Sequence, residues 1–390
     1  MSTLKVDGIR SNSASSDAIT LASDGTCTAN ITSINGGQFA NRNKLINGAM
    51  QIAQRGTSIT TGDNAEHFLM DRWILYCQNT GSRFTVTQST DTPDGFGNSL
   101  KIDCTTADTS LASNEEVQLW QKIEGFNTQD FAKGTSSAKQ YTLSFYVKTN
   151  KTGTYIVRLL GRDNTTSCVS ASYTVSDSNW NRYTVTFPAN TDSNHADNND
   201  NGESLRAVWW LVGGSGVDSG TLQTTWTNST DTGAATGQVN FADSTSNDFF
   251  ITGCQLEVGS VATDFEHRSY GQEWELCRRY YQVILDRSID SGDDSGLGGT
   301  PYSSTSGVYV PIRFAPPMRT KPTVESSSAG NEFRTRHGDL VTFDSFSGFN
   351  TVTRLGGTLI ASTSTGKTVG HYYWIETDQG SAKLAVSSEL

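Results

Sequence analysis

Short segments in which apolar and polar residues alternate recur along the chain, and this pattern restricts its fold most. Side chains on a strand point alternately to its two faces. In residues 141–148 one face would carry only large apolar side chains, namely Tyr141, Leu143, Phe145 and Val147. Residues 182–187 repeat the pattern, and residues 205–212 are apolar on both faces, as in a central strand. Many short strands joined by polar loops predict a mostly β fold with an antiparallel β-sandwich or jelly roll.

The composition agrees with this prediction. Only 35% of the 390 residues are hydrophobic and 18% are charged, so much of the remainder is Gly, Ser, Thr, Asn and other turn-forming residues. These residues are weak helix formers. The 10% of aromatic residues is enough to fill β-sheet cores.

Changes in pattern divide the chain into four parts. Residues 1–40 contain short β pieces that are too small to build a core alone, and we interpret them as an attachment arm. Residues 41–270 form the jelly-roll domain, with long polar loops at 191–203 and 228–248. Residues 291–390 return to strand patterns and predict a small distal β-sandwich, with strands at 308–314, 341–343, 351–355, 359–362, 369–375 and 383–386.

The fourth part, residues 271–290, is predicted to be a connecting helix. Within 271–284, Trp274, Cys277 and Tyr281 follow helical spacing. This helix would either wedge between the two β domains or lie along the axis of a trimer.

Charge, hydropathy and cysteine spacing argue against a nucleic-acid-binding, membrane-spanning or zinc-binding protein. The formal net charge of −11 disfavours nucleic-acid binding, because an acidic surface repels phosphate. Residues 1–11 lack the apolar core of a signal peptide, and no run of about 18 apolar residues predicts a membrane-spanning helix. We therefore expect synthesis in a cytoplasm without membrane insertion. The six Cys residues show no metal-binding spacing and are expected to be small buried apolar residues.

Motifs of catalytic sites are absent. The chain has no GxSxG elbow, P-loop or HExxH motif, and its five His residues are scattered. The carboxylate pairs Glu115–Glu116 and Asp293–Asp294 are adjacent in sequence, so on a strand they would point to opposite faces. The chain is therefore not expected to be an enzyme and needs no cofactor for catalysis.

One loop has part of a calcium-binding pattern. Asp197, Asn199 and Asn201, followed by Gly202, match the first half of an EF-hand loop, in which oxygen ligands surround Ca²⁺. The twelfth position is Val208, where that motif needs a bidentate Glu. A structural Ca²⁺ and a plain solvated loop both remain open.

Strand alternation also suggests a sugar-binding surface. Aromatic faces stack on the C–H-rich faces of sugars, and polar side chains bind the hydroxyl groups. In the segments 117–123, 141–148 and 205–212, one face would present Gln118, Trp120, Tyr146, Arg206 and Trp210. These five residues are the predicted carbohydrate site. The alternative is that the rings are buried under a loop, the second sheet or a neighbouring subunit.

Several strings of residues resemble one family of bacteriophage tail-fibre-type virion proteins. They are 43–51 (NKLINGAMQ), 54–56 (QRG), 71–73 (DRW), 255–259 (QLEVG), 262–266 (ATDFE), 273–281 (EWELCRRYY) and 387–390 (SSEL). The match covers about residues 41–285 well and the rest loosely. The resemblance implies a carbohydrate-binding-module-like jelly roll on a virion appendage, usually trimeric, but no ligand residue carries over.

Together these features predict a phage tail-fibre subunit in the virion. The expected partners are two further copies in a homotrimer, tail or portal-proximal proteins bound through residues 1–40, and a host surface polysaccharide. One alternative is a fibre or decoration protein of the capsid surface. Another is a polysaccharide depolymerase, although the chain lacks the repeats of a parallel β-helix.

Overall fold

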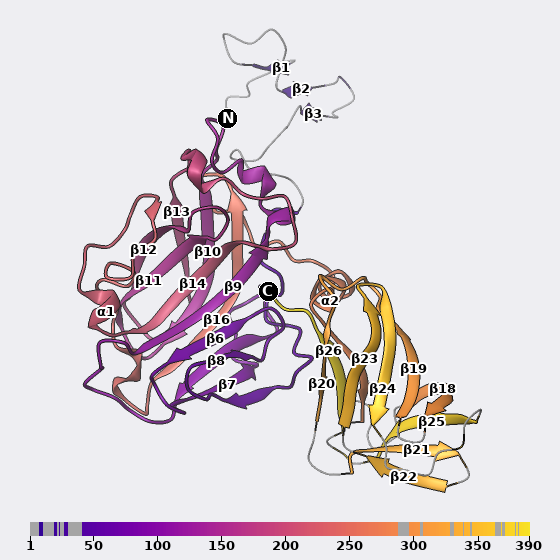
Figure 1. Cartoon of the computed structure of the whole chain (residues 1–390). Coiled ribbons are helices and arrows are strands. Elements are labelled where there is room, and N and C mark those ends of the chain that lie inside the picture. Colours follow the sequence, from indigo (N-terminus) through magenta and orange to yellow (C-terminus); the bar gives the residue numbers. More distant parts are fainter. Residues whose placement is uncertain are drawn as a thin grey trace.

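The computed structural model describes residues 8–10, 19–21, 23, 27–29, 41–287, 296–304, 307–327, 331–337, 339–343, 345–362, 368, 371–378, 380 and 382–390. The strands in these ranges pair in antiparallel sheets, so the predicted mostly β fold is confirmed. Two β domains lie side by side, with helix α2 (Tyr270–Arg278) between them (Figure 1).

The larger domain is a sandwich of two sheets. The six-stranded sheet has the order β13 (Asn181–Phe187), β10 (Tyr141–Thr149), β16 (Asp248–Val258), β8 (Ser99–Cys104), β7 (Phe84–Ser89) and β4 (Ser58–Thr60). The seven-stranded sheet has the order β15 (Thr227–Asn228), β12 (Ser167–Val175), β11 (Gly153–Gly161), β14 (Glu203–Gly213), β9 (Glu116–Glu124), β6 (Ile74–Gln78) and β5 (Ala65–Phe68). The alternating segments of the sequence therefore supply the central strands of both sheets.

The main core lies between these two sheets. It receives the predicted inward faces, including Leu143, Phe145 and Trp209. Val212 also lies in this core, although alternation places it on the outer face with Trp210. The register of β14 shifts between Trp210 and Val212, and this irregularity turns Val212 inward. The five Cys residues whose side chains are described are free and buried, as expected.

Helix α2 is shorter than predicted. It begins with a capping box in which Ser269 and Gln272 bond each other's backbone, and it ends at Arg278. Residues 281–286 form strand β17 (Tyr281–Asp286), which pairs with β26 (Lys383–Ser387), so the prediction of helix to residue 284 is wrong. The backbone hydrogen bonds to β26 override the helical spacing of the aromatic residues. Helix α1 (Ser215–Asp218) and 3-10 turns at 125–127, 129–131, 193–195 and 241–243 complete the helical elements described.

The distal domain also contains two sheets. One has the order β17, β26, β20 (Thr323–Ser326). The other has the order β22 (Asp339–Phe343), β21 (Phe333–His337), β25 (Tyr372–Thr377), β18 (Gly296–Ser304), β19 (Gly307–Arg313), β24 (Gly356–Ser362) and β23 (Ser345–Thr353). Its core includes Val310, Phe333 and Leu384.

Within residues 1–40, three short strands form a separate sheet. They are β1 (Gly8–Ile9), β2 (Ile19–Leu21) and β3 (Cys27–Ala29). Of the short β pieces that we expect within residues 1–40, the one at residues 5–7 lies outside the described residues. The attachment role of this segment stays a prediction.

Buried charged residues join the two β domains. Arg72 is only 1% exposed; its guanidinium pairs with Glu389, donates to the Lys122 carbonyl at 2.6 Å and lies 3.5 Å from the centre of the Tyr280 ring. The Arg279 guanidinium holds both carboxylate oxygens of Glu124 at 2.7 Å. We call this group the junction cluster. It gathers residues from the strings 71–73, 273–281 and 387–390, so these strings have a structural role here.

Candidate functional site

The predicted sugar-binding residues on β9 and β14 share the outer face of the seven-stranded sheet. The strand register places Trp210 opposite Gln118, which in turn lies opposite Tyr76. The next row carries Arg158, Val208, Trp120 and Ile74, and the row after it carries Leu160, Arg206 and Lys122. Pairing between neighbouring strands therefore assembles side chains from four strands on one face.

A cavity of about 180 Å³ lies on this face. We call it the outer-sheet cavity. It is bounded by the sheet and by the segment 217–234, and its lining includes Glu116, Gln118, Trp120, Arg158, Leu160, Arg162, Arg206, Trp210, Val217, Ser229, Asp231 and Ala234. Four of the five predicted residues thus line one cavity.

Tyr146 does not belong to this group. It lies on β10, in the other sheet of the sandwich, where its ring is 5.3 Å from that of Phe96. The prediction of one platform that includes Tyr146 is therefore wrong. Alternation assigns a residue to one face of its own strand, but it does not identify which sheet that strand joins.

The two Trp rings are largely covered. Trp120 is 5% exposed and stacks on Tyr76 at 4.8 Å, while the Arg206 guanidinium lies 4.2 Å from its centre. Trp210 is 2% exposed and packs in an apolar cluster with Val217, Ala234 and Ala235. The structure therefore favours the alternative of burial under a loop over an open stacking platform. The long polar segment after β14 gave no sequence signal that it would return over the sheet.

Polar groups at the cavity remain suited to sugar hydroxyls. Gln118 donates to Glu116 at 2.7 Å, and Arg206 binds both oxygens of Glu203 at 2.6 and 2.9 Å. Burial raises the pKa of Glu116; the hydrogen bond from Gln118 and the charge of Arg158 oppose this shift, whereas the charge of Asp231 adds to it. Carboxylate, amide and guanidinium groups together can accept from and donate to neighbouring hydroxyls. Glu116, Arg158, Arg162 and Asp231 could not be chosen from sequence, because nothing local in their patterns marks a cavity.

The predicted calcium ligands have other partners. Asp197 lies 2.5 Å from the ammonium group of Lys133, whose side chain is fully buried. The Asn201 amide donates to the Arg319 carbonyl at 2.8 Å, and the Asn199 side chain makes no hydrogen bond within the described residues. The charge that Ca²⁺ would need from Asp197 is already paired with Lys133. Within the described ranges no three His, Cys, Asp or Glu side chains gather as a metal-binding group, and we do not propose calcium binding here.

The paired carboxylates also separate. Glu115 accepts from Arg83 at 2.9 Å and from the Ala112 amide at 2.7 Å, whereas Glu116 lines the cavity. Asp293 and Asp294 lie outside the described residues. No helix in the part of the chain that the structure describes is long and apolar enough to cross a membrane.

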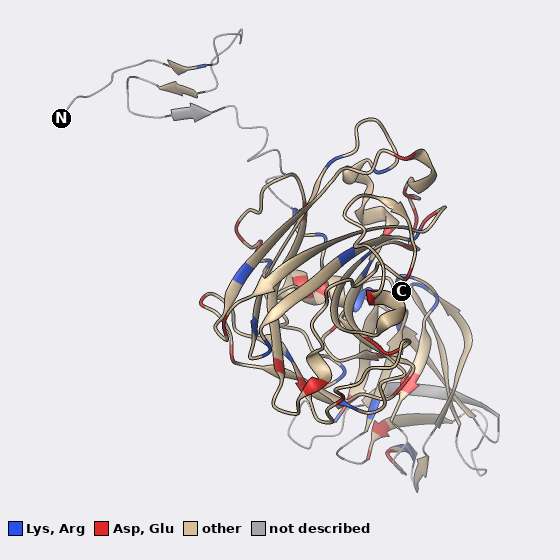
Figure 2. Ribbon diagram, turned by 90° about the vertical axis from the view of Figure 1, so that its left-hand side faces the viewer, with Lys and Arg blue, Asp and Glu red and all other residues tan. Residues whose placement is uncertain are grey.

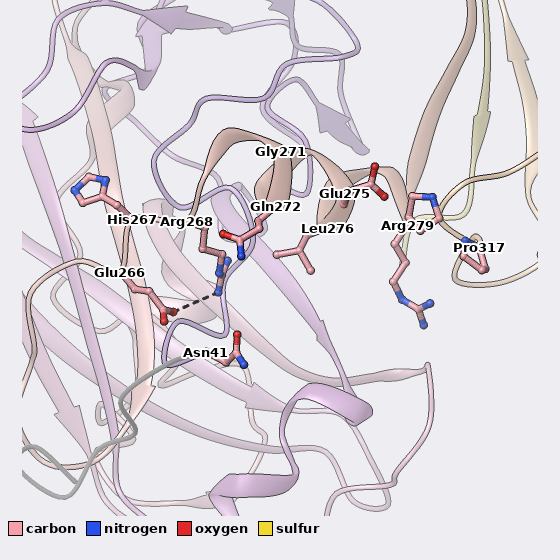
Figure 3. Close-up of a pocket in the computed structure, with 11 residues that line it drawn as sticks. Asn41, Glu266, His267, Arg268, Gly271, Gln272, Glu275, Leu276, Arg279 and Pro317 are labelled. Carbon is pink, nitrogen blue, oxygen red and sulfur yellow. Dashed lines mark ion pairs between the residues drawn. The ribbon is translucent and has the colours of Figure 1, made fainter. Parts of the chain in front are cut away.

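A larger cavity, of about 730 Å³, lies beside α2 (Figure 3). Leu276 and Gln272 of the helix face it, together with Pro317 of the distal domain. Its charged groups are already paired: Arg268 lies 3.8 Å from Glu266, Glu275 lies 3.7 Å from Arg278, and Arg279 lies 2.7 Å from Glu124. We interpret this cavity as a consequence of how the two β domains meet.

The chain resembles solved carbohydrate-binding domains at low similarity. A putative sugar binding protein from Bacteroides thetaiotaomicron matches over 56% of this chain and 100% of its own, with 14% identity and a TM-score of 0.31. A family 11 carbohydrate-binding module from Clostridium thermocellum matches over 54% and 98%, with 12% identity and a TM-score of 0.27. A family 16 carbohydrate-binding module matches over 44% and 84%, with 14% identity and a TM-score of 0.24. No family model and no curated protein matches the chain.

Proposed function

We propose that this chain is a glycan-binding protein whose sandwich domain holds a sugar residue in the outer-sheet cavity. The observation that carries the proposal is the gathering of Gln118, Arg206 and the cavity carboxylates on one face of the seven-stranded sheet. The covered Trp rings shape the cavity, and the polar groups at its edge bind hydroxyls. Binding without chemistry is the proposed role.

We further propose that the protein is a subunit of a phage tail fibre in the virion. The ordered strings that resemble such proteins support this proposal. Residues 1–40 would attach a homotrimer to the tail, and several weak sugar sites would then act together on one cell surface. A capsid-surface location is the main alternative, and locating the chain in a virion reconstruction would decide between them.

Substitutions at the cavity mouth test the sugar site without disturbing the core. Asp231 is exposed and the Arg162 side chain is 42% exposed, so Asp231→Asn and Arg162→Gln should leave the fold intact. Each should weaken binding to a glycan found on an array by about tenfold, as expected for one lost charge-assisted hydrogen bond.

The matched control is Asp94→Asn, which changes an exposed carboxylate away from the cavity. The sugar site would be excluded if no glycan binds, or if both cavity variants bind as tightly as the control. Incubation with the bound polysaccharide should leave its chain length unchanged. Shortened chains would favour a depolymerase instead.

A further inference from the structure

One buried cation lacks the partner that the others have. Four Lys or Arg residues in the described ranges are buried, namely Arg72, Lys122, Lys133 and Arg158. The first three each pair with a carboxylate: Arg72 with Glu389, Lys122 with Glu66 at 2.9 Å and Lys133 with Asp197 at 2.5 Å. Arg158, which is 4% exposed, has no carboxylate within ion-pair distance among the described residues. A buried charge without a counter-charge is strongly unfavourable in proteins.

The hydrogen bonds of Arg158 are all to neutral groups. Its Nη2 donates to Gln223 Oε1 at 3.0 Å, Ser229 Oγ at 3.1 Å and the Thr230 carbonyl at 3.0 Å. Its Nε is buried and has no hydrogen-bond partner within the described part of the chain. Glu116 is near enough for the charge of Arg158 to lower its pKa, but the two groups form no ion pair or hydrogen bond, so the Nε donor remains available to another group.

Arg158 of β11 lines the outer-sheet cavity together with two other Arg residues. Arg162 and Arg206 line the same cavity, against two carboxylates, Glu116 and Asp231. Glu203 lies 2.6 Å from Arg206 and 3.9 Å from Arg162, so of these three guanidinium groups only that of Arg158 has no carboxylate at ion-pair distance among the described residues. Figure 2 shows acidic and basic residues interspersed along the described part of the ribbon.

We propose that the sugar bound in the outer-sheet cavity is an acidic one, and that its carboxylate pairs with Arg158. This inference rests on the proposed sugar-binding function. A guanidinium and a carboxylate form a strong charge-assisted hydrogen bond, which would supply the missing counter-charge. A singly charged uronic or sialic acid fits better than a sugar phosphate, because a phosphate carries about −1.5 to −2 charges and would face Glu116 and Asp231.

Carboxyl reduction of the ligand gives the sharpest test. The probes are glycans that carry glucuronic, galacturonic, mannuronic or sialic acid, each paired with its carboxyl-reduced neutral counterpart. The wild-type chain should bind at least one acidic glycan about tenfold or more tightly than its reduced counterpart, as expected for one buried ion pair. This ratio needs no protein variant, so it is independent of any folding defect.

A variant then assigns the preference to one residue. Arg158→Gln should abolish the preference for the acidic glycan while it keeps the affinity for the reduced one. Arg313→Gln, on an exposed position of β19, is the control and should keep the preference. Thermal melting of the wild type and of both variants checks that loss of the Arg158 Nη2 hydrogen bonds to residues 223–230 has not unfolded the protein.

The outcomes separate the two proposals. Equal binding of every acidic and reduced pair, or a preference that survives in folded Arg158→Gln, overturns the acidic ligand but leaves sugar binding standing. Binding to neither member of any pair overturns the acidic ligand, and the proposed function is overturned as well only if no glycan on the array binds.

Discussion

Glu389 is the carboxylate on which the junction cluster depends, and its substitution should destabilise the protein strongly. Its side chain is 8% exposed and pairs with Arg72, which is 1% exposed, and with Arg55 at 3.2 Å. In Glu389→Gln the Arg72 charge would stay buried with only neutral acceptors. Loss of one partner of a buried ion pair costs about 3–5 kcal/mol. Because a Gln oxygen still accepts one hydrogen bond, we expect a loss near the lower end, about 3 kcal/mol.

Denaturant unfolding followed by Trp fluorescence measures this loss. Six of the eight Trp residues lie in the sandwich, so the signal reports on the domain that receives Glu389. The control is Glu275→Gln on α2, whose side chain is 57% exposed and lies 3.7 Å from Arg278. An exposed pair of this kind is worth about 0–1 kcal/mol.

A double-mutant cycle identifies the cause. Adding Arg72→Met to Glu389→Gln removes the unpaired charge, so the double variant should lose less stability than the sum of the two single losses. If Glu389→Gln loses no more than the Glu275→Gln control, the buried pair is not what joins the domains.

Three further changes test other buried groups. Burial raises the pKa of Asp71 to about 6 from its ordinary value of 3.8, so the protonated form is favoured in the folded state. This contribution to stability is fully present below the unfolded-state pKa and is lost as the pH rises through about 6. Between pH 4 and pH 8 the free energy of unfolding of the wild type should therefore fall by about 2 kcal/mol relative to that of Asp71→Asn, as measured by unfolding titrations at each pH. Lys133→Met should lower the free energy of unfolding by about 3–5 kcal/mol because Asp197 is left buried and unpaired, and adding Asp197→Leu should recover part of that loss. Gly48→Ala should lower the melting temperature, since its Cβ would lie 2.2 Å from the Cys254 carbonyl oxygen and overpacking costs about 1–3 kcal/mol; an unchanged melting temperature would show that this strand contact can relax.

Strand positions were predictable from sequence because their signal is local. The alternation in 141–148 and 182–187 directly determines which side chains face the core, and β10 and β13 follow it. The end of α2 was not predictable in this way. Tyr281 fits a helix by spacing, and only its pairing with Ser387, far along the chain, makes it part of a strand.

The candidate site depended still more on distant contacts. Alternation placed Gln118, Trp120, Arg206 and Trp210 on outer faces correctly, because each lies in a regular stretch of strand. It could not show that the segment 217–234 covers the two rings. Nor could it reveal that Arg158 lacks a carboxylate, since the partners of a buried charge come from anywhere in the sequence.

The return of residues 383–390 to the sandwich has a mechanical consequence. The distal domain is tied to the sandwich by two stretches of chain, α2 with β17 on entry and β26 with Glu389 on exit (Figure 1). β17 and β26 are also hydrogen-bonded to each other. A force that pulls the distal domain away from the sandwich would therefore be divided between β17 and β26. Both connections must give way before the two domains separate.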